Sequence, residues 1–218
     1  MKHVEAVLLD LDDTLISSYG TGKTYFQEIA RDAGLRIPPE EEIRSYWGRT
    51  VEGIAKGIWG DDYVRFMESY ENRTERVIPF HDGVEDALRR MSYFLPLGIV
   101  TSRTKSDTCL AFEKINADPR TYFRWVFGCD EVDHHKPDPR VFDRILAEME
   151  EVGIRRNGVI YSGDHIFDFF AARDAGLGFY GVTTGVYDRG SFLDSGLADE
   201  RILDSISELP IMLGIDES

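Results

Sequence analysis

Short apolar runs recur along the chain, and each is followed directly by hydroxyl or carboxylate residues. The first three cover residues 4–9, 97–100 and 158–161, and a further run at 179–182 ends in two threonines. These runs are too short for helices, and unbroken apolar character is typical of strands buried on both faces of a parallel sheet. The pattern therefore predicts parallel strands with polar residues at their carboxyl ends.

The segments between these runs have the spacing of amphipathic helices. Apolar residues recur at helical intervals in residues 84–91 and again in residues 141–152, so that each helix can pack one stripe on the sheet. Strands that alternate with helices are typical of an α/β fold with a doubly wound parallel sheet, whose ligands bind beyond the carboxyl ends of the strands. We expect a Rossmann-like architecture of this kind.

The strand pattern disappears between residues 14 and 80. That segment contains charged, amphipathic stretches at residues 25–33, 40–47 and 63–77, with Pro38 and Pro39 between the first two. Residues 79–83 include the proline and glycine at which the chain returns to the sheet. We predict a small inserted helical domain at residues 16–80 and a sheet domain formed by residues 1–15 and 81–218.

The composition favours a small-molecule partner. The chain has 218 residues and is 42% hydrophobic, and its 25 lysines and arginines against 40 aspartates and glutamates give a formal net charge of -15. Such an acidic surface repels nucleic acid and anionic membranes, so we expect neither as a partner. The composition makes no prediction of oligomeric state.

The first residues and the cysteines predict a cytoplasmic protein. The apolar start of the chain is interrupted by Asp10, Asp12 and Asp13, unlike a signal peptide. Two cysteines, Cys109 and Cys129, fit a reduced compartment in a chain of this length, and we expect them to be small core residues. A disulfide between them is the less favoured alternative.

Acidic residues lie at the carboxyl end of the first predicted strand. Asp10 and Asp12, in Asp10-Leu11-Asp12-Asp13-Thr14, could divide the labour, one attacking an electrophile and the other transferring protons. The structural alternative is a polar turn in which Asp12 or Asp13 accepts hydrogen bonds from backbone N–H groups. Taken alone, this segment leaves both interpretations open.

A second acidic segment, Gly163-Asp164-His165-Ile166-Phe167-Asp168, follows the third predicted strand. If a helix begins near Asp164, then Asp164 and Asp168 share a face and could hold a hard cation. The alternative is a helix N-terminus that favours acids through its dipole. Because several carboxylates in one crevice repel each other, a divalent metal would resolve their repulsion.

A hydroxyl pair and a lysine complete the candidate chemistry. Thr101 and Ser102 follow the second predicted strand, and Lys136 lies in His134-His135-Lys136-Pro137-Asp138-Pro139. Hydroxyl and ammonium groups are suited to the non-bridging oxygens of a phosphoryl group. Each alone also has an ordinary explanation, a helix N-cap for Thr101 and a solvated surface residue for Lys136.

The order of these segments is similar to that of a known family. DLDDT, GIVTSR, KPDP and GDHIFD resemble the four motifs of haloacid dehalogenase-type phosphotransferases, and the resemblance spans nearly the whole chain. The insertion after the first motif is similar to the helical cap of subfamilies that resemble phosphoglycolate phosphatase and β-phosphoglucomutase. Differences from the family pattern are His165, where relatives often have serine, and Ser102, where asparagine is frequent.

The resemblance implies a role for each matching residue. Asp10 would attack phosphorus and Asp12 would protonate the leaving oxygen. Thr101, together with Ser102, would bind the phosphoryl group, and Lys136 would bind it too and orient the nucleophile.

The resemblance also implies a Mg²⁺ site and a substrate contact from the cap. The metal would bind among Asp10, Asp12, Asp164 and Asp168, with Asp12 contributing its backbone carbonyl and Asp168 acting directly or through a neighbour. Arg49, in Trp47-Gly48-Arg49-Thr50, could clamp a carboxylate or a second phosphate of the substrate. A solvated arginine at a helix end is the equally favoured alternative.

These observations predict a magnesium-dependent phosphatase that hydrolyses a small phosphorylated metabolite through an aspartyl-phosphate intermediate, similar to phosphoglycolate phosphatase. An acid two residues after the nucleophile favours phosphoryl transfer over dehalogenation, since halide leaves without a proton. The alternatives are a phosphosugar mutase and, from another class, a non-catalytic phosphoacceptor or regulatory protein. Residues 20–24 resemble the end of a nucleotide-binding P-loop but do not follow a strand directly, so we expect a flexible start of the insertion there.

Overall fold

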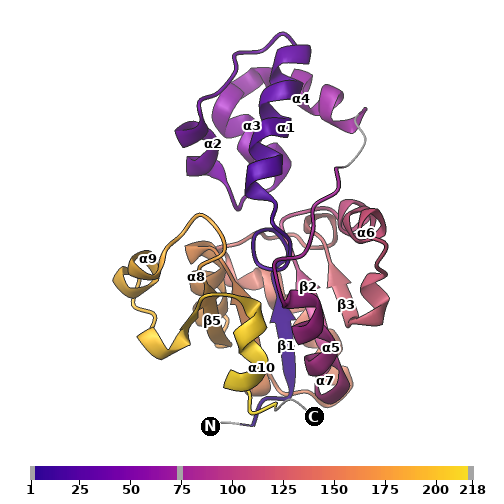
Figure 1. The fold of residues 1–218 in the computed structure, drawn as a ribbon, viewed down its shortest axis with the longest axis vertical. Coiled ribbons are helices and arrows are strands. Elements are labelled where there is room, and N and C mark those ends of the chain that lie inside the picture. Colours follow the sequence, from indigo (N-terminus) through magenta and orange to yellow (C-terminus); the bar gives the residue numbers. More distant parts are fainter. Residues whose placement is uncertain (1–2, 73–75, 216–218) are drawn as a thin grey trace.

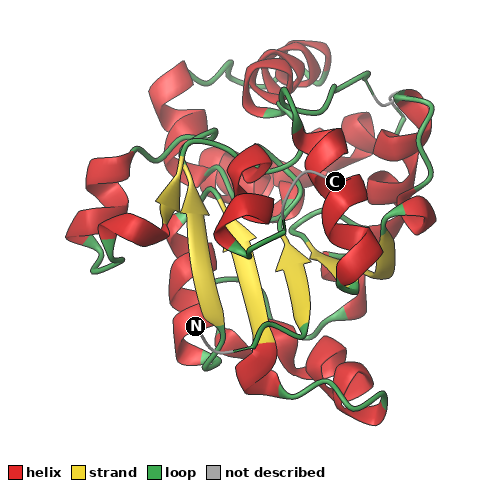
Figure 2. Ribbon diagram, turned by 60° about the horizontal axis from the view of Figure 1, so that its bottom comes forward, coloured by secondary structure: helices red, strands yellow, loops and turns green. Residues whose placement is uncertain are grey.

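The computed structural model describes residues 3–72 and 76–215. Within these residues the chain forms a sheet of 6 parallel strands in the order β3-β2-β1-β4-β5-β6, with helices packed around it (Figure 2). The strands are β1 (Ala6–Leu9), β2 (Leu97–Val100), β3 (Phe123–Phe127), β4 (Val159–Gly163), β5 (Gly178–Val182) and β6 (Ile202–Leu203). The predicted doubly wound α/β fold is confirmed.

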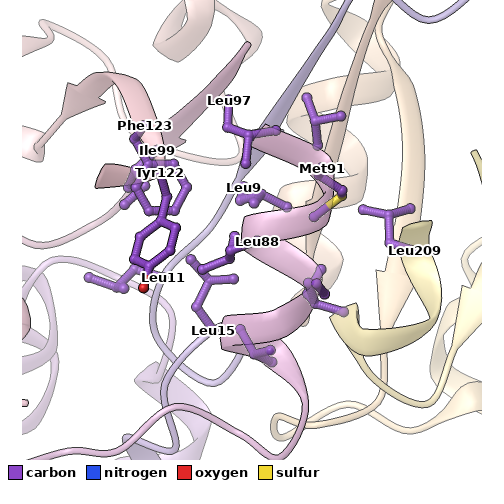
Figure 3. Close-up of a cluster of buried hydrophobic side chains, with 14 of the residues drawn as sticks. Leu9, Leu11, Leu15, Leu88, Met91, Leu97, Ile99, Tyr122, Phe123 and Leu209 are labelled. Atoms are coloured by element: carbon purple, nitrogen blue, oxygen red, sulfur yellow. The ribbon is translucent and has the colours of Figure 1, made fainter. Parts of the chain in front are cut away.

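The central strands separate two hydrophobic clusters. Along β1, Val7 and Leu9 face one cluster, whereas Ala6 and Leu8 face the other, as the alternation of side chains in a strand requires. Figure 3 shows the first cluster, in which Leu88 and Met91 pack beside Leu9. Apolar residues on both faces explain why the strand sequences are unbroken apolar runs.

A different set of helices covers each face of the sheet. The first cluster receives side chains from α5 (Val84–Phe94), α6 (Lys105–Lys114) and α10 (Leu209–Met212). The second receives them from α7 (Asp143–Glu151), α8 (Ile166–Asp174) and α9 (Arg189–Asp194). The predicted helix at residues 141–152 is divided, because a 3-10 turn covers Pro139–Phe142 before α7 begins.

The segment between β1 and α5 is helical and lies over the carboxyl ends of the strands (Figure 1). We call this segment the cap. Its helices are α1 (Tyr19–Asp32), α2 (Glu40–Tyr46), α3 (Val51–Trp59) and α4 (Tyr63–Glu71), and they share a separate hydrophobic cluster that includes Phe26, Ile43 and Phe66. The predicted stretch at residues 63–77 contains α4, but its residues 73–75 lie outside the described part of the chain.

The two connections between the sheet and the cap lie side by side. The backbone N–H of Ser17 donates to the carbonyl of Pro79 over 3.0 Å, and that of His81 donates to Leu15 over 2.9 Å. The chain therefore enters and leaves the cap at neighbouring points.

The structure corrects two expectations. Residues 20–24 are not a flexible start of the insertion, because they form the first turns of α1; Gly22 allows the Trp47 ring to lie directly against that helix. Cys109 is exposed and Cys129 only partly buried, so they are not core residues. Both are free thiols. Among the described helices, none combines the length and the apolar character that crossing a membrane would require.

Candidate active site

Asp10 lies at the centre of the sheet, where β1 pairs with both β2 and β4. Its backbone N–H donates to the carbonyl of Ser162 over 2.9 Å, which continues the pairing of β1 with β4. The strand order reverses direction here, and in doubly wound sheets such a point opens a crevice at the carboxyl ends of the strands. The side chain of Asp10 is buried, with 6% of its surface exposed.

Lys136 pairs with one carboxylate from the first predicted motif and one from the last. Its Nζ lies 2.7 Å from Oδ1 of Asp10 and 2.7 Å from Oδ1 of Asp168, and it donates to the hydroxyl of Tyr161 over 3.1 Å. Burial by itself would lower the pKa of Lys136, but the combined attraction of the two carboxylates outweighs it and raises that pKa. The lysine is therefore a fixed positive charge beside Asp10.

Tyr161 is a residue of this network that the sequence did not reveal. Its hydroxyl donates to the backbone carbonyl of Val100 over 2.9 Å and lies 3.2 Å from Oδ1 of Asp168. In the sequence it is the last residue of an apolar run, and an aromatic residue there gives no signal beyond a buried strand.

Asp164 and Asp168 converge, but not through the geometry expected from the sequence. Helix α8 begins at Ile166 with His165 as its N-cap, so Asp164 precedes the helix instead of sharing a face with Asp168. Asp168 turns back and accepts from the backbone N–H of His165 over 3.0 Å. Thr14 donates its hydroxyl to Oδ1 of Asp164 over 2.9 Å. Asp168 is therefore part of a helix N-terminus and also part of the carboxylate cluster.

One carboxylate oxygen from each of Asp10, Asp164 and Asp168 lies within 4.8 Å of the other two, and all three residues are buried. Burial, and to a lesser extent repulsion by Asp168, raises the pKa of Asp10 to about 7 despite the opposing effect of Lys136. Burial and repulsion by neighbouring aspartates also raise the pKa of Asp164. Buried hard oxygen ligands whose charges oppose each other fit a divalent cation such as Mg²⁺.

The side chain of Asp12 is not part of this cluster and pairs with Arg103. Nε of Arg103 lies 2.8 Å from Oδ2 of Asp12, and Nη2 lies 2.8 Å from Oδ1. Burial raises the pKa of Asp12, but the attraction of Arg103 and its hydrogen bonds outweigh burial and lower it. The sequence did not single out Arg103, although it follows Thr101 and Ser102 directly.

Asp13 accepts hydrogen bonds from backbone N–H groups, which is the structural role that the sequence offered as one interpretation of this segment. Its Oδ1 accepts from the backbone N–H groups of Ser18 and Tyr19, over 2.9 and 2.8 Å, at the start of α1. Its Oδ2 accepts from Nε1 of Trp47 over 2.7 Å. Asp13 therefore fixes the cap to the end of β1.

The two hydroxyl residues after β2 differ in their surroundings. Thr101 is buried, and its Oγ1 accepts from the backbone N–H of Arg103 over 3.2 Å. Ser102 lines the cavity and donates its hydroxyl to the backbone carbonyl of Gly48 in the cap, over 2.9 Å. This hydrogen bond connects the sheet domain to the cap.

A cavity lies between the sheet and the cap. Its floor carries Asp10, Asp12, Lys136, Asp164 and Asp168, and Arg49 contributes to its side. The guanidinium of Arg49 lies over the rings of Tyr46 and Phe167, 5.3 and 6.0 Å from their centroids. Of the candidate residues, all but the buried Thr101 line this cavity.

A buried aspartate held by a lysine, beside further carboxylates and under a helical cap, is an arrangement suited to phosphoryl transfer on an α/β fold. Residues 7–182 match the model of the haloacid dehalogenase-like hydrolases. The chain belongs to this family.

Comparisons with individual proteins agree with this assignment. A phosphoglycolate phosphatase of Neisseria gonorrhoeae is 26% identical over 228 residues, which cover 96% of this chain and 93% of that protein. A phosphoglycolate phosphatase of Escherichia coli K12 is 35% identical over 124 residues, covering 57% of this chain and 46% of that protein. A solved hydrolase from Pseudomonas syringae superposes with a TM-score of 0.75 at 21% identity, covering 98% of this chain and 100% of that one. The family and the relatives named as phosphatases confirm the predicted enzyme class, a phosphatase of the haloacid dehalogenase type.

Proposed function

We propose that this protein is a magnesium-dependent phosphatase that hydrolyses a small phosphorylated metabolite through a phosphorylated Asp10. The observation that carries the proposal is the position of Asp10, which is buried at the floor of the cavity with Lys136 2.7 Å away. Asp12, a second acid, lines the same cavity. Relatives named phosphoglycolate phosphatase support a phosphate monoester as substrate.

In the first step, a carboxylate oxygen of Asp10 forms a bond to phosphorus while the bond from phosphorus to the leaving oxygen breaks. Asp12, in its acid form, donates a proton to that oxygen. Lys136 keeps Asp10 oriented and offsets negative charge beside it. The products of this step are the free alcohol and an acyl phosphate on Asp10.

In the second step, Asp12 is a carboxylate and takes a proton from a water molecule. The water oxygen attacks phosphorus, the bond between phosphorus and Asp10 breaks, and inorganic phosphate forms. Arg103 favours the carboxylate form of Asp12, which is the form that this step needs.

Asp10 and Asp164 would hold Mg²⁺, together with the backbone carbonyl of Asp12. Asp168 would support the site, since hydrogen bonds and an ion pair already occupy both of its oxygens. When bound, Mg²⁺ supplies positive charge that offsets the carboxylates and the phosphoryl oxygens.

Substrate contacts come from both sides of the cavity. Thr101 and Ser102, with Lys136, would bind the phosphoryl oxygens from the sheet side. Arg49 would bind the phosphate group of the substrate from the cap side.

The test is phosphate release from a panel of phosphorylated metabolites with Mg²⁺, using the wild-type protein and Asp10→Asn. We expect the variant to lose activity toward every substrate, because an amide is a poor nucleophile toward phosphorus. Intact-mass measurement after rapid quenching should show one added phosphoryl group on the wild-type protein only.

The matched control is Asp138→Asn. Asp138 pairs with Arg140 at the surface, 2.6 Å away, and this variant should keep wild-type turnover. Turnover by Asp10→Asn that does not arise from deamidation back to aspartate would exclude covalent catalysis through Asp10.

A further inference from the structure

Most of the cap residues that line the cavity are apolar or aromatic, with Thr21, Arg49 and Arg76 as the polar exceptions, whereas the floor is charged. This wall consists of residues from α1, α3, α4 and the adjoining loops: Tyr25, Phe26, Trp47, Val51, Ile54, Tyr70 and Ile78. We infer that the phosphate ester hydrolysed here has an uncharged leaving group with an aromatic or bulky apolar body. This inference rests on the proposed function, because it assigns the wall to the leaving group of that reaction.

Part of the wall belongs to the hydrophobic core of the cap, and part does not. Phe26 and Ile54 are buried within the cap cluster. Val51 and Tyr70 pack on the edge of that cluster, remain only partly buried, and line the cavity. Their apolar surface faces the space above Asp10, where it can gain from contact with an apolar ligand.

Two of the cations that line the cavity near the wall already have carboxylate partners. Arg103 pairs with Asp12, and Arg76 pairs with Glu28. Arg49 lies over Phe167, in the first turn of α8 next to Asp168, so its charge is placed toward the phosphoryl end of the cavity. The wall itself therefore offers little to an anionic leaving group.

The cavity continues into a second hollow between α4 and α6, and the two share Tyr25, Val51, Tyr70, Ser102 and Arg103, whose charge is paired with Asp12. The second hollow adds Met67 and Leu110, together with acidic residues on its rim: Glu52, Glu71, Asp107 and Asp130. A negatively charged leaving group would be repelled there, whereas an apolar one could extend past Tyr70. Charge and shape thus both favour an uncharged apolar group over a carboxylate.

The first experiment measures binding and does not depend on catalysis. Propylphosphonate, 3-phenylpropylphosphonate and 3-phosphonopropanoate share one head group and differ only in the tail. Calorimetry with Mg²⁺ should show the phenyl compound binding roughly tenfold or more tightly than the propyl compound, as expected for burial of an aromatic ring. Equal affinities for these two compounds, or tightest binding of the carboxylate, would overturn the inference.

The second experiment tests the wall through a variant and its matched control. Val51→Ser removes apolar surface at the first residue of α3, where a helix tolerates a polar side chain. It should lower the affinity for the phenyl compound about three- to tenfold and leave the propyl compound unchanged. Val64→Ser makes the same change at a cap position that is 47% exposed and does not line the cavity, and it should change neither.

Turnover separates this inference from the proposed function. Wild-type protein should hydrolyse 2-phenylethyl phosphate with a higher kcat/KM than ethyl phosphate or phosphoglycolate. If phosphoglycolate is preferred and Asp10→Asn is inactive, the proposed function stands and the inference fails. If no ester is hydrolysed while the phenyl phosphonate still binds most tightly, the wall has its assigned ligand and the proposed function fails.

Discussion

The two carboxylates that the proposed reaction uses, Asp10 and Asp12, each pair with a cation but have pKa values shifted in opposite directions. Lys136 lies beside Asp10 and shares its charge with Asp168, whereas Arg103 binds Asp12 through two nitrogens. The pKa of Asp10 is raised to about 7, mainly by burial, and that of Asp12 is lowered because Arg103 outweighs burial. The carboxylate form of Asp12 that Arg103 favours is the form that takes a proton from water in the second step, whereas the first step needs the acid form.

We expect Asp12→Ala to separate the two steps by the nature of the leaving group. A nitrophenolate departs without a proton, so the variant should still form the phosphoenzyme from nitrophenyl phosphate but hydrolyse it slowly. Rapid-quench measurements should then show a burst followed by a low steady rate. An alkyl phosphate needs the proton, and its first step should slow by about a hundred- to ten-thousand-fold.

Asp13→Asn is a useful comparison for that experiment. Asp13 bonds to the start of α1 and to Trp47, so its loss should weaken the cap without changing the dependence on leaving group. Asp12→Ala could instead slow both substrates equally and give no phosphoenzyme from the aryl ester. That result would show that Asp12 has a structural role and does not transfer protons.

At the residue scale, the sequence predicted which side chains gather but not how they pair. Asp10, Lys136 and Asp164 follow strands or lie in a recognisable segment, so their place at the sheet edge was predictable. Arg103 and Tyr161 were not, because an arginine in a loop and a tyrosine in a strand have ordinary explanations. Their partners depend on contacts between segments that are 91 residues apart for Asp12 and Arg103 and 61 apart for Val100 and Tyr161.

At the scale of elements, the loop between α2 and α3 makes a close contact with the start of α8. Gly48 has a φ of +87°, and a Cβ atom there would lie 2.6 Å from Cδ2 of His165. The His165 ring packs against Phe167 and Tyr187, with centroids 4.4 and 4.5 Å apart, and it has little room to move. Gly48 therefore allows the cap to lie directly on the segment that carries Asp164 and Asp168.

We expect Gly48→Ala to raise KM several-fold, since the added methyl group would hold the cap away from His165 and open the cavity. The matched control is Gly60→Ala, at a cap position with φ of +56° and no atom within 4 Å of the added group. That variant should lower stability by roughly 1–3 kcal/mol through backbone strain alone. Steady-state kinetics and thermal unfolding of both variants would test this, and an unchanged KM in Gly48→Ala would contradict it.

The elements that the sequence did not predict have physical reasons. In β3, exposed Arg124 interrupts the apolar run, and β6 has only 2 residues. Helix α3 contains Gly53 and Gly57, which lower helix propensity, and its stability comes from packing Ile54, Ala55 and Ile58 into the cap cluster. Unbroken apolar runs at the sheet centre were predictable, whereas edge strands and glycine-containing helices depend on tertiary contacts.

At the scale of the whole molecule, the buried carboxylates connect stability to pH. The pKa values of Asp10 and Asp13 are raised to about 7 and about 6, above the value of about 3.9 for aspartate in an unfolded chain. Between about pH 4 and 7 these two groups therefore bind more protons in the folded protein than in the unfolded chain, so their contribution to stability should fall as pH rises through this window. Burial lowers the pKa of His165 to about 4, and this group acts in the opposite direction below about pH 6.5.

We expect metal-free protein to unfold at a higher temperature at pH 5.5 than at pH 8, and Mg²⁺ to raise Tm more at pH 8. Saturating Mg²⁺ at about a hundred times its Kd would contribute about 2.7 kcal/mol, or several degrees in a chain of this size. Calorimetry with chelator and with Mg²⁺ would measure both effects. Asp164→Asn should remove most of the Mg²⁺ shift, whereas a Mg²⁺ shift of equal size at both pH values would argue against a carboxylate site.

The paired connections at residues 15–17 and 79–81 have a consequence for how this chain can change. Because the backbone of Ser17 bonds to that of Pro79, the first and last residues of the helical segment are neighbours in space. A short turn could replace residues 18–78 without moving β1 or Asp10. Genetic exchange at these two adjacent points could therefore graft a different lid onto the same reaction centre, and selection could alter the choice of substrate without rebuilding the chemistry.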